Sequence, residues 1–241
     1  MSETLHIADL VFEVRRGPRR KTLGLTVDRA GELVVHAPQS ASDEELRKWV
    51  NRKLLWVHRK LAQKQAMNSA VRTPEFVSGE SFYYLGKNYR LRVVEHADVA
   101  LSFDGERFLL RRADINDAVR NFHKWYLITG TPWLTQRVST WGPRLDVQPL
   151  RIKVTDLGFR WGSCGKNHVV HFNWRVLQLP VRCIDYVIVH ELAHLLEHNH
   201  TREFWRILDR TLPDWLERKR TIDSEWQSYC AFAIERFLLS T

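Results

Sequence analysis

The stretch HELAHLLEHNH, residues 190–200, contains four histidines within eleven positions. His190 and His194 are four residues apart, so on a helix their side chains lie one turn apart on the same face and can bind one metal ion. Glu191, next to the first histidine, can act as a base for a water molecule at that metal. The stretch therefore predicts a metal-dependent hydrolase whose active-site helix supplies two metal ligands.

The third ligand is either His198 or His200, because zinc in catalytic sites usually takes three protein ligands. A continuous helix would place His198 about 12 Å along its axis from His190, which is too far for a shared ion. If the helix ends near His198, Asn199 tolerates the left-handed conformation that would turn His200 back towards the metal. The predicted site has His190, His194 and His200 as ligands of one Zn²⁺, or of another divalent transition metal, and Glu191 as the catalytic base.

A metal at this place predicts hydrolytic chemistry. Zinc lowers the pKa of a bound water towards about 7 and polarises a carbonyl. Glu191 would take the proton of the water and pass it to the leaving amine. Hydrolysis of a peptide bond is therefore the leading prediction.

Composition limits the class of protein. The chain has 241 residues, 44% of them hydrophobic, which is enough for a large core without disulfides. Three widely spaced cysteines fit no disulfide framework and favour a reducing compartment. The sequence shows neither a signal peptide nor an apolar segment of membrane-spanning length, so we expect a cytoplasmic protein without a membrane anchor. A net charge of +9 favours anionic partners.

Hydrophobic periodicity predicts an α+β chain with a β-rich N-terminal domain, residues 1–112, that contains one amphipathic helix. The second domain, residues 113–241, carries the histidines on a buried helix. The expected elements are a hairpin over 23–37, a helix over 42–61 with a Ser42/Glu45 capping box, a loop over 62–75, strands within 82–95 and 100–112, a helix over 114–141 interrupted at 130–132, and short strands within 151–180.

Aromatic residues near the motif are expected to pack in the core. Phe204 and Trp205 recur with Ile207 and Leu208 at helical spacing, which predicts a helix behind the site. Tyr186, one turn before His190, fits the core better than the site, and burial is also expected for Trp215.

Several segments together resemble a known family. They are RRKTLGLTV (19–27), VVHAP (34–38), YLGKNYRLRV (84–93), RWGSC (160–164), HFNW (171–174), YVIVHELAHLLEHNH (186–200) and FW (204–205). The chain resembles the YgjP-like metal-dependent hydrolases, a metallopeptidase family related to the SprT-like and Wss1-like zinc proteases.

The resemblance implies a zincin-like metallopeptidase domain with the same three histidines as ligands and Glu191 as base. It also implies that RWGSC and HFNW are strands that flank the active cleft. An extended substrate would pair with such an edge strand. The residues expected to contact it are Arg160, Trp161, Gly162, Ser163 and Asn173. Trp161 and Trp174 fit a core position equally well.

Two alternatives accompany the peptidase prediction. The resemblance also suggests a metal-dependent UTP pyrophosphatase, but such an enzyme needs several cations around the phosphates, and the motif has only Arg160, Arg202 and Arg206 near it. The segment RRGPRRK, residues 15–21, has five basic residues in seven. It could make the chain a nucleic-acid-binding module without enzymatic activity, or bring a nucleic acid to the protease. The expected partners are thus a protein or peptide substrate and, through the basic surface, a nucleic acid or nucleotide.

Overall fold

Alternating apolar residues near the N-terminus form a four-stranded sheet in the computed structural model, which describes residues 3–27, 32–70, 74–158, 160–165 and 167–229. The strands are β1 (Glu3–Ile7), β2 (Leu10–Gly17), β3 (Gly24–Val27) and β4 (Leu33–Pro38). Their order is β1-β2-β4-β3, with β2 parallel to β4 and the other neighbours antiparallel. Val27 pairs with Leu33 and Gly24 with His36, which confirms the predicted hairpin.

The amphipathic helix predicted after this sheet is present but is divided into α1 (Asp43–Asn51) and α2 (Leu54–Ala70). Its capping box is confirmed: Ser42 Oγ accepts the N–H of Glu45 at 3.3 Å, and the Glu45 carboxylate accepts the N–H of Ser42 at 3.0 Å. The prediction of a loop from residue 62 was wrong as far as Ala70. The reason is that alanine, glutamine, lysine and methionine, which dominate this segment, all favour helix.

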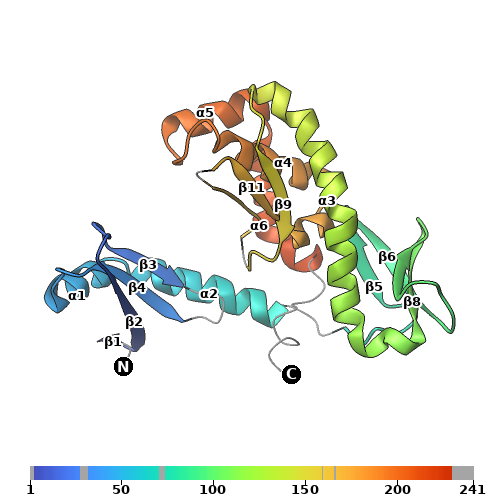
Figure 1. Cartoon of the computed structure of the whole chain (residues 1–241), viewed down its shortest axis with the longest axis horizontal. Coiled ribbons are helices and arrows are strands. Elements are labelled where there is room, and N and C mark those ends of the chain that lie inside the picture. The colour runs from blue at the N-terminus through green and yellow to red at the C-terminus, as the bar shows by residue number, and fades with distance from the viewer. Residues whose placement is uncertain (1–2, 28–31, 71–73, 159, 166, 230–241) are drawn as a thin grey trace. The chain divides into compact units, whose positions relative to one another are not determined.

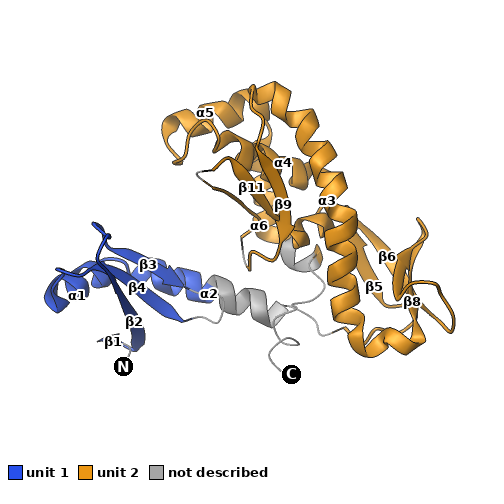
Figure 2. Cartoon of the chain, viewed as in Figure 1, with its two compact units in different colours: residues 1–70 blue, residues 71–241 orange. Residues whose placement is uncertain are grey.

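This sheet and both helices lie in the first of two compact units, residues 1–70 and 71–241 (Figure 2). The first unit has a hydrophobic core of its own, which includes Phe12, Val35 and Leu46. Strand alternation places Phe12 and Val35 on one face of the sheet, and α1 packs its buried residue Leu46 into the same core.

A second four-stranded sheet begins the second unit, with the order β5-β6-β8-β7. Its strands are β5 (Ser81–Tyr84), β6 (Lys87–Val94), β7 (Leu101–Phe103) and β8 (Arg107–Arg111). The rings of Phe82 in this sheet and Phe122 in the long helix α3 (Ala118–Leu145) stack with centroids 4.2 Å apart. The sheet and α3 therefore share one core, and the predicted domain boundary at residue 112 falls inside the second unit.

Helix α3 follows a short 3-10 helix, η1 (Arg112–Asp117), and continues through Pro132, where a kink or an interruption was expected. Its Gly130 leaves room for a neighbouring side chain, because a Cβ there would lie 2.0 Å from Cδ1 of Leu177. Although α3 has 28 residues, none of the described helices is both long and apolar enough to cross a membrane.

A three-stranded sheet of order β10-β11-β9 and three further helices complete the second unit (Figure 1). The elements are β9 (Arg151–Thr155), β10 (Gly162–Cys164), β11 (Val169–Asn173), the 3-10 helix η2 (Trp174–Gln178), α4 (Val181–Ala193), α5 (Arg202–Thr211) and α6 (Trp215–Tyr229). Strand β11 runs parallel to β9 and antiparallel to β10, which lies at the edge. Helix α4 contacts α3, α5, α6 and β10, so it is central to this unit. The described chain is thus α+β, as predicted.

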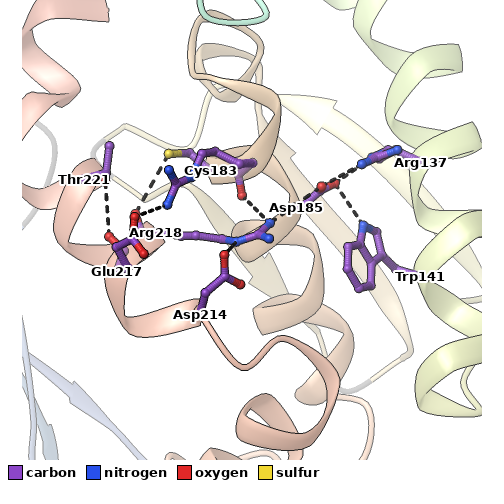
Figure 3. Close-up of polar contacts among 9 residues, drawn as sticks. Arg137, Trp141, Cys183, Asp185, Asp214, Glu217, Arg218 and Thr221 are labelled. Atoms are coloured by element: carbon purple, nitrogen blue, oxygen red, sulfur yellow. Dashed lines mark hydrogen bonds and ion pairs between the residues drawn. The ribbon is translucent and has the colours of Figure 1, made fainter.

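A buried carboxylate ties α4 to its neighbours (Figure 3). Asp185 on α4 is only 4% exposed. Its two oxygens accept hydrogen bonds of 2.6 Å each from Nε and Nη2 of Arg137 on α3, and Oδ1 also accepts one of 2.9 Å from Nε1 of Trp141. Arg218 on α6 places Nη1 3.8 Å from Oδ2. Because every partner comes from another helix, these contacts fix the position of α4 within the unit.

Candidate metal centre

The helix that carries the motif ends earlier than expected. Helix α4 stops at Ala193, with His194 as its C-cap residue, and the chain turns from there. The prediction that the helix would extend to His198 was therefore wrong. Asn199 was expected to have a left-handed conformation, but it is not among the described residues with positive φ. Instead, its N–H donates to the Glu197 carboxylate at 3.1 Å.

This early turn brings three histidines together. Their ligand atoms, one nitrogen each from His190, His194 and His200, all lie within 4.8 Å of one another. Nε2 of His190 and Nε2 of His200 are 3.1 Å apart. Two nitrogens bound at 2.0–2.1 Å to one tetrahedral zinc would be separated by about 3.3 Å, so the arrangement fits such an ion. His198 does not belong to this group among the described residues.

Two of the histidines have a partner on the ring nitrogen that faces away from the others. Nδ1 of His194 lies 3.1 Å from the Glu197 carbonyl oxygen, which can only accept, so Nδ1 carries the proton and Nε2 offers its lone pair. Nδ1 of His190 lies 3.5 Å from the hydroxyl of Tyr186. Burial, followed by the neighbouring histidines, lowers the pKa of His190 to about 3, and burial also lowers the pKa of His194. Both rings are therefore neutral, which is the form that binds metals.

Glu191 points into a closed environment beside this group. It is only 6% exposed, and burial raises the pKa of its carboxyl to about 8. Two contacts act in the opposite direction: the positive charge of Arg160, and a hydrogen bond from the backbone N–H of Cys164. A buried carboxyl with a strongly raised pKa next to three converging imidazoles is typical of a catalytic site.

The family follows from a comparison with known proteins. The metallopeptidase domain model of the YgjP-like proteins matches residues 21–225. The chain belongs to the YgjP-like metallopeptidase family. It is accordingly a metal-dependent hydrolase, as the motifs predicted. Among solved structures, the metallopeptidase zymogen abylysin of Pyrococcus abyssi is 22% identical, with a TM-score of 0.34 over 37% of this chain and 91% of that one. No curated protein was found to match.

Four of the five residues expected to contact substrate in this YgjP-like protein lie at or next to the edge strand β10. Arg160 is exposed, whereas Trp161, Gly162 and Ser163 are partly buried. The Trp161 carbonyl accepts the N–H of Asn173 in β11, and Ser163 pairs with His171. Backbone groups alternate along a strand, so those of Gly162 and Cys164 point away from β11. At this free edge the backbone N–H of Cys164 donates a hydrogen bond to the Glu191 carboxylate. Sequence patterns gave no means to foresee this contact.

Asn173, the fifth residue expected to contact substrate, is buried in the structure. Its side chain is only 1% exposed, and its amide donates to the carbonyl oxygens of Gly158 at 2.8 Å and Arg160 at 2.9 Å. Asn173 therefore holds the loop that precedes β10 and positions the backbone of Arg160. Trp174, for which core and cleft were both open, is fully buried in the core.

Gly162 is adjacent to the carboxyl of Glu191. A Cβ at this position would lie 2.5 Å from Cγ and 2.6 Å from Oε1 of Glu191. Because Glu191 is enclosed, Gly162→Ala is expected to displace the carboxyl and lower kcat for hydrolysis about 10- to 100-fold, with zinc affinity unchanged. Steady-state kinetics and a zinc titration measure the two effects.

Gly165→Ala is the matched control for this substitution, because a Cβ there would meet only the Val169 carbonyl oxygen, at an ordinary 3.6 Å. Its kcat should stay at the wild-type value. Equal activity of the two alanine variants would show that Glu191 does not depend on the space at residue 162.

The basic run RRGPRRK lies in the first unit, and part of its charge is compensated there. Nη2 of Arg15 lies 2.7 Å from Glu13. Nη2 of Arg16 lies 2.7 Å from Glu3 and 3.0 Å from Asp43. Two of the five basic residues in the run are thus paired with carboxylates, and nucleic-acid binding by this surface stays a prediction.

Proposed function

We propose that this YgjP-like metallopeptidase is a zinc-dependent endopeptidase in which His190, His194 and His200 bind the ion and Glu191 is the catalytic base. The observation that carries the proposal is the group of three imidazoles whose nitrogens lie within 4.8 Å of one another, with the enclosed carboxyl of Glu191 on the residue after His190. Carboxyls with perturbed pKa values cluster at catalytic sites, where a general base needs a defined position relative to the proton that it takes.

The protein residues would divide the work between binding and proton transfer. When bound, zinc supplies Lewis acidity, which lowers the pKa of a water ligand towards about 7 and polarises a carbonyl. Glu191 accepts a proton from the attacking water and delivers it to the nitrogen of the leaving amine. The Cys164 N–H keeps the carboxyl oriented, and the charge of Arg160 favours its ionised form.

An extended polypeptide is the substrate that the site favours. Strand β10 lies at the edge of its sheet and next to α4, and such edges bind extended chains by backbone hydrogen bonds. Gly162 and Ser163 would line this edge, with the exposed Arg160 at its beginning. In this proposal the substrate would lie between the edge strand and the metal, as in a zincin-like cleft.

Nucleotide hydrolysis is less well supported by the charges around the site. A triphosphate needs several cations that are free to surround it. Among the arginines near the motif, Nη1 of Arg206 is paired with Glu203 at 3.2 Å, and Arg160 acts on Glu191. We therefore favour the peptidase over the UTP pyrophosphatase.

A cytoplasmic location and a nucleic-acid partner are further parts of the proposal. The cysteine content supports the location, and the net charge of +9 supports the partner.

Removal of the metal tests the proposal directly. Purified protein is incubated with a denatured, unstructured protein and, separately, with UTP, before and after treatment with a chelator. We expect cleavage of the polypeptide, its loss on chelation and its recovery when zinc is added back. Release of phosphate or pyrophosphate from UTP without cleavage of any polypeptide would favour the pyrophosphatase, and cleavage that survives chelation would exclude a metal mechanism.

A further inference from the structure

His200 is supported differently from the other two histidines. His190 lies within α4 and His194 caps it, whereas His200 lies in the turn before Thr201, the N-cap residue of α5. The Nδ1 atoms of His190 and His194 face a hydroxyl and a carbonyl, respectively. Within the described residues, Nδ1 of His200 has no such hydrogen bond. Metal-binding histidines are usually oriented by a bond of this kind, whereas the exposed His200 ring contacts aromatic side chains.

The contact on the face of the His200 ring comes from an aromatic side chain. The indole of Trp205, in the first turns of α5, stacks on the His200 imidazole with centroids 5.5 Å apart and planes inclined by 24°. Trp205 in turn stacks on Trp215 at 4.7 Å and 23°. Trp215 is itself fixed, because its Nε1 donates to the Asp209 carboxylate at 2.7 Å.

The stack continues to a second histidine. Trp215 lies parallel to Tyr186, at 6.4 Å and 15°, and the hydroxyl of Tyr186 is the group next to Nδ1 of His190. We call Trp205, Trp215 and Tyr186 the aromatic stack. Its two ends contact two different histidines of the site, one from α4 and one from the turn.

A fourth ring lies beneath the histidines. Phe204 is fully buried, and its ring centroid is 5.0 Å from that of His190, 4.5 Å from that of His194 and 4.7 Å from that of His200. Helix α5 therefore presents two consecutive aromatic residues to the site: Phe204 contacts all three imidazoles, and Trp205 covers the face of the His200 ring. Contact with the buried Phe204 ring restricts how far each imidazole can rotate.

We propose that Trp205 is a positioning residue that holds His200 in its metal-binding orientation by ring stacking, and that the aromatic stack links this ligand to His190. The proposal rests on the proposed function, since it takes the three histidines as ligands. It differs from the sequence-based expectation that Trp205, Trp215 and Tyr186 only fill the core. A hydrogen bond orients an imidazole through one atom, whereas a stacked indole orients the plane of the ring.

The test separates stacking from simple filling of space. Zinc dissociation constants are measured by competition with a chromophoric chelator for the wild type, Trp205→Phe, Trp205→Leu and Trp205→Ala. We expect Trp205→Phe to stay within about threefold of the wild type, and the leucine and alanine variants to bind zinc about 10- to 100-fold more weakly. Because leucine keeps apolar volume but has no ring face, equal affinity of the Leu and Phe variants would overturn the proposal.

The experiment also needs a control variant, Trp133→Ala, and a Co²⁺ absorption spectrum of each protein. Trp133 on α3 is also partly buried, and no ring contact between it and the three histidines is described. Trp133→Ala should lower Tm without changing the zinc dissociation constant; a loss of affinity equal to that of Trp205→Ala would point to general loosening and overturn the proposal. The Co²⁺ absorption spectrum should change in Trp205→Leu and not in Trp133→Ala. Failure of the wild type itself to bind zinc would instead refute the proposed function.

Discussion

Glu191→Gln is expected to lower kcat for polypeptide cleavage by about 10²- to 10⁴-fold while the protein keeps its metal. Glutamine has nearly the same shape and fills the same enclosed space, but its amide cannot accept the proton of the attacking water. The three histidines do not depend on the carboxyl for their positions, so metal content measured after dialysis should equal that of the wild type.

Glu106→Gln is the matched control, because Glu106 lies in the exposed turn between β7 and β8 and its carboxylate pairs with Arg107 at 3.3 Å. We expect it to cleave the polypeptide at the wild-type rate. Wild-type activity in Glu191→Gln would exclude Glu191 as the base.

The Glu191→Gln variant should also be more stable than the wild type when both lack metal. Burial raises the pKa of Glu191 from 4.5 to about 8 in the folded protein. Its contribution to stability is therefore fully present below about pH 4.5 and is lost as the pH rises through about 8. The glutamine side chain cannot ionise, so at about pH 7 the free energy of unfolding of its unit should exceed the wild-type value by on the order of 3 kcal/mol. Denaturant titrations across this pH range, in the presence of chelator, measure the difference.

Loss of the third ligand should distinguish two neighbouring histidines. His200→Ala is expected to weaken zinc binding roughly a thousandfold, since three or four ligands share the binding free energy of a protein zinc site. His198→Ala should bind zinc like the wild type, because the imidazole of His198 is exposed and lies outside the group of converging nitrogens. Competition titrations with a chelator give both constants, and metal loss confined to the His198 variant would overturn the ligand assignment.

Local sequence patterns predicted the group of histidines more accurately than the structure around it. Spacing of four residues places His190 and His194 on one helix face, and this geometry holds whatever the rest of the chain does. The end of α4 was missed because it depends on contacts outside the helix, among them the approach of the Glu197 carbonyl to His194. The three histidines that converge are nevertheless the three expected as ligands. A turn at His194, like the turn expected near His198, brings His200 close to His190 and His194.

Packing between segments far apart in the sequence explains the other differences between the predictions and the structure. Phe82 and Phe122 stack across 40 positions of sequence, so no periodicity could assign their sheet and helix to one unit. The burial of Asn173 has the same origin, because its partners, the carbonyls of Gly158 and Arg160, belong to a loop that only the folded sheet brings near. Side-chain type and spacing identify the apolar face of a helix or strand. They do not identify which other segment of the chain packs against that face.

The two separate hydrophobic cores have a consequence for how the protein melts. Each unit buries its own apolar cluster, so each can lose its structure in its own cooperative transition, and calorimetry of the whole chain need not follow a two-state curve. A metal that binds only the folded second unit raises the midpoint of that unit alone. Zinc dependence of a thermogram would thus identify which heat-absorption peak belongs to the second unit, without any change to the sequence.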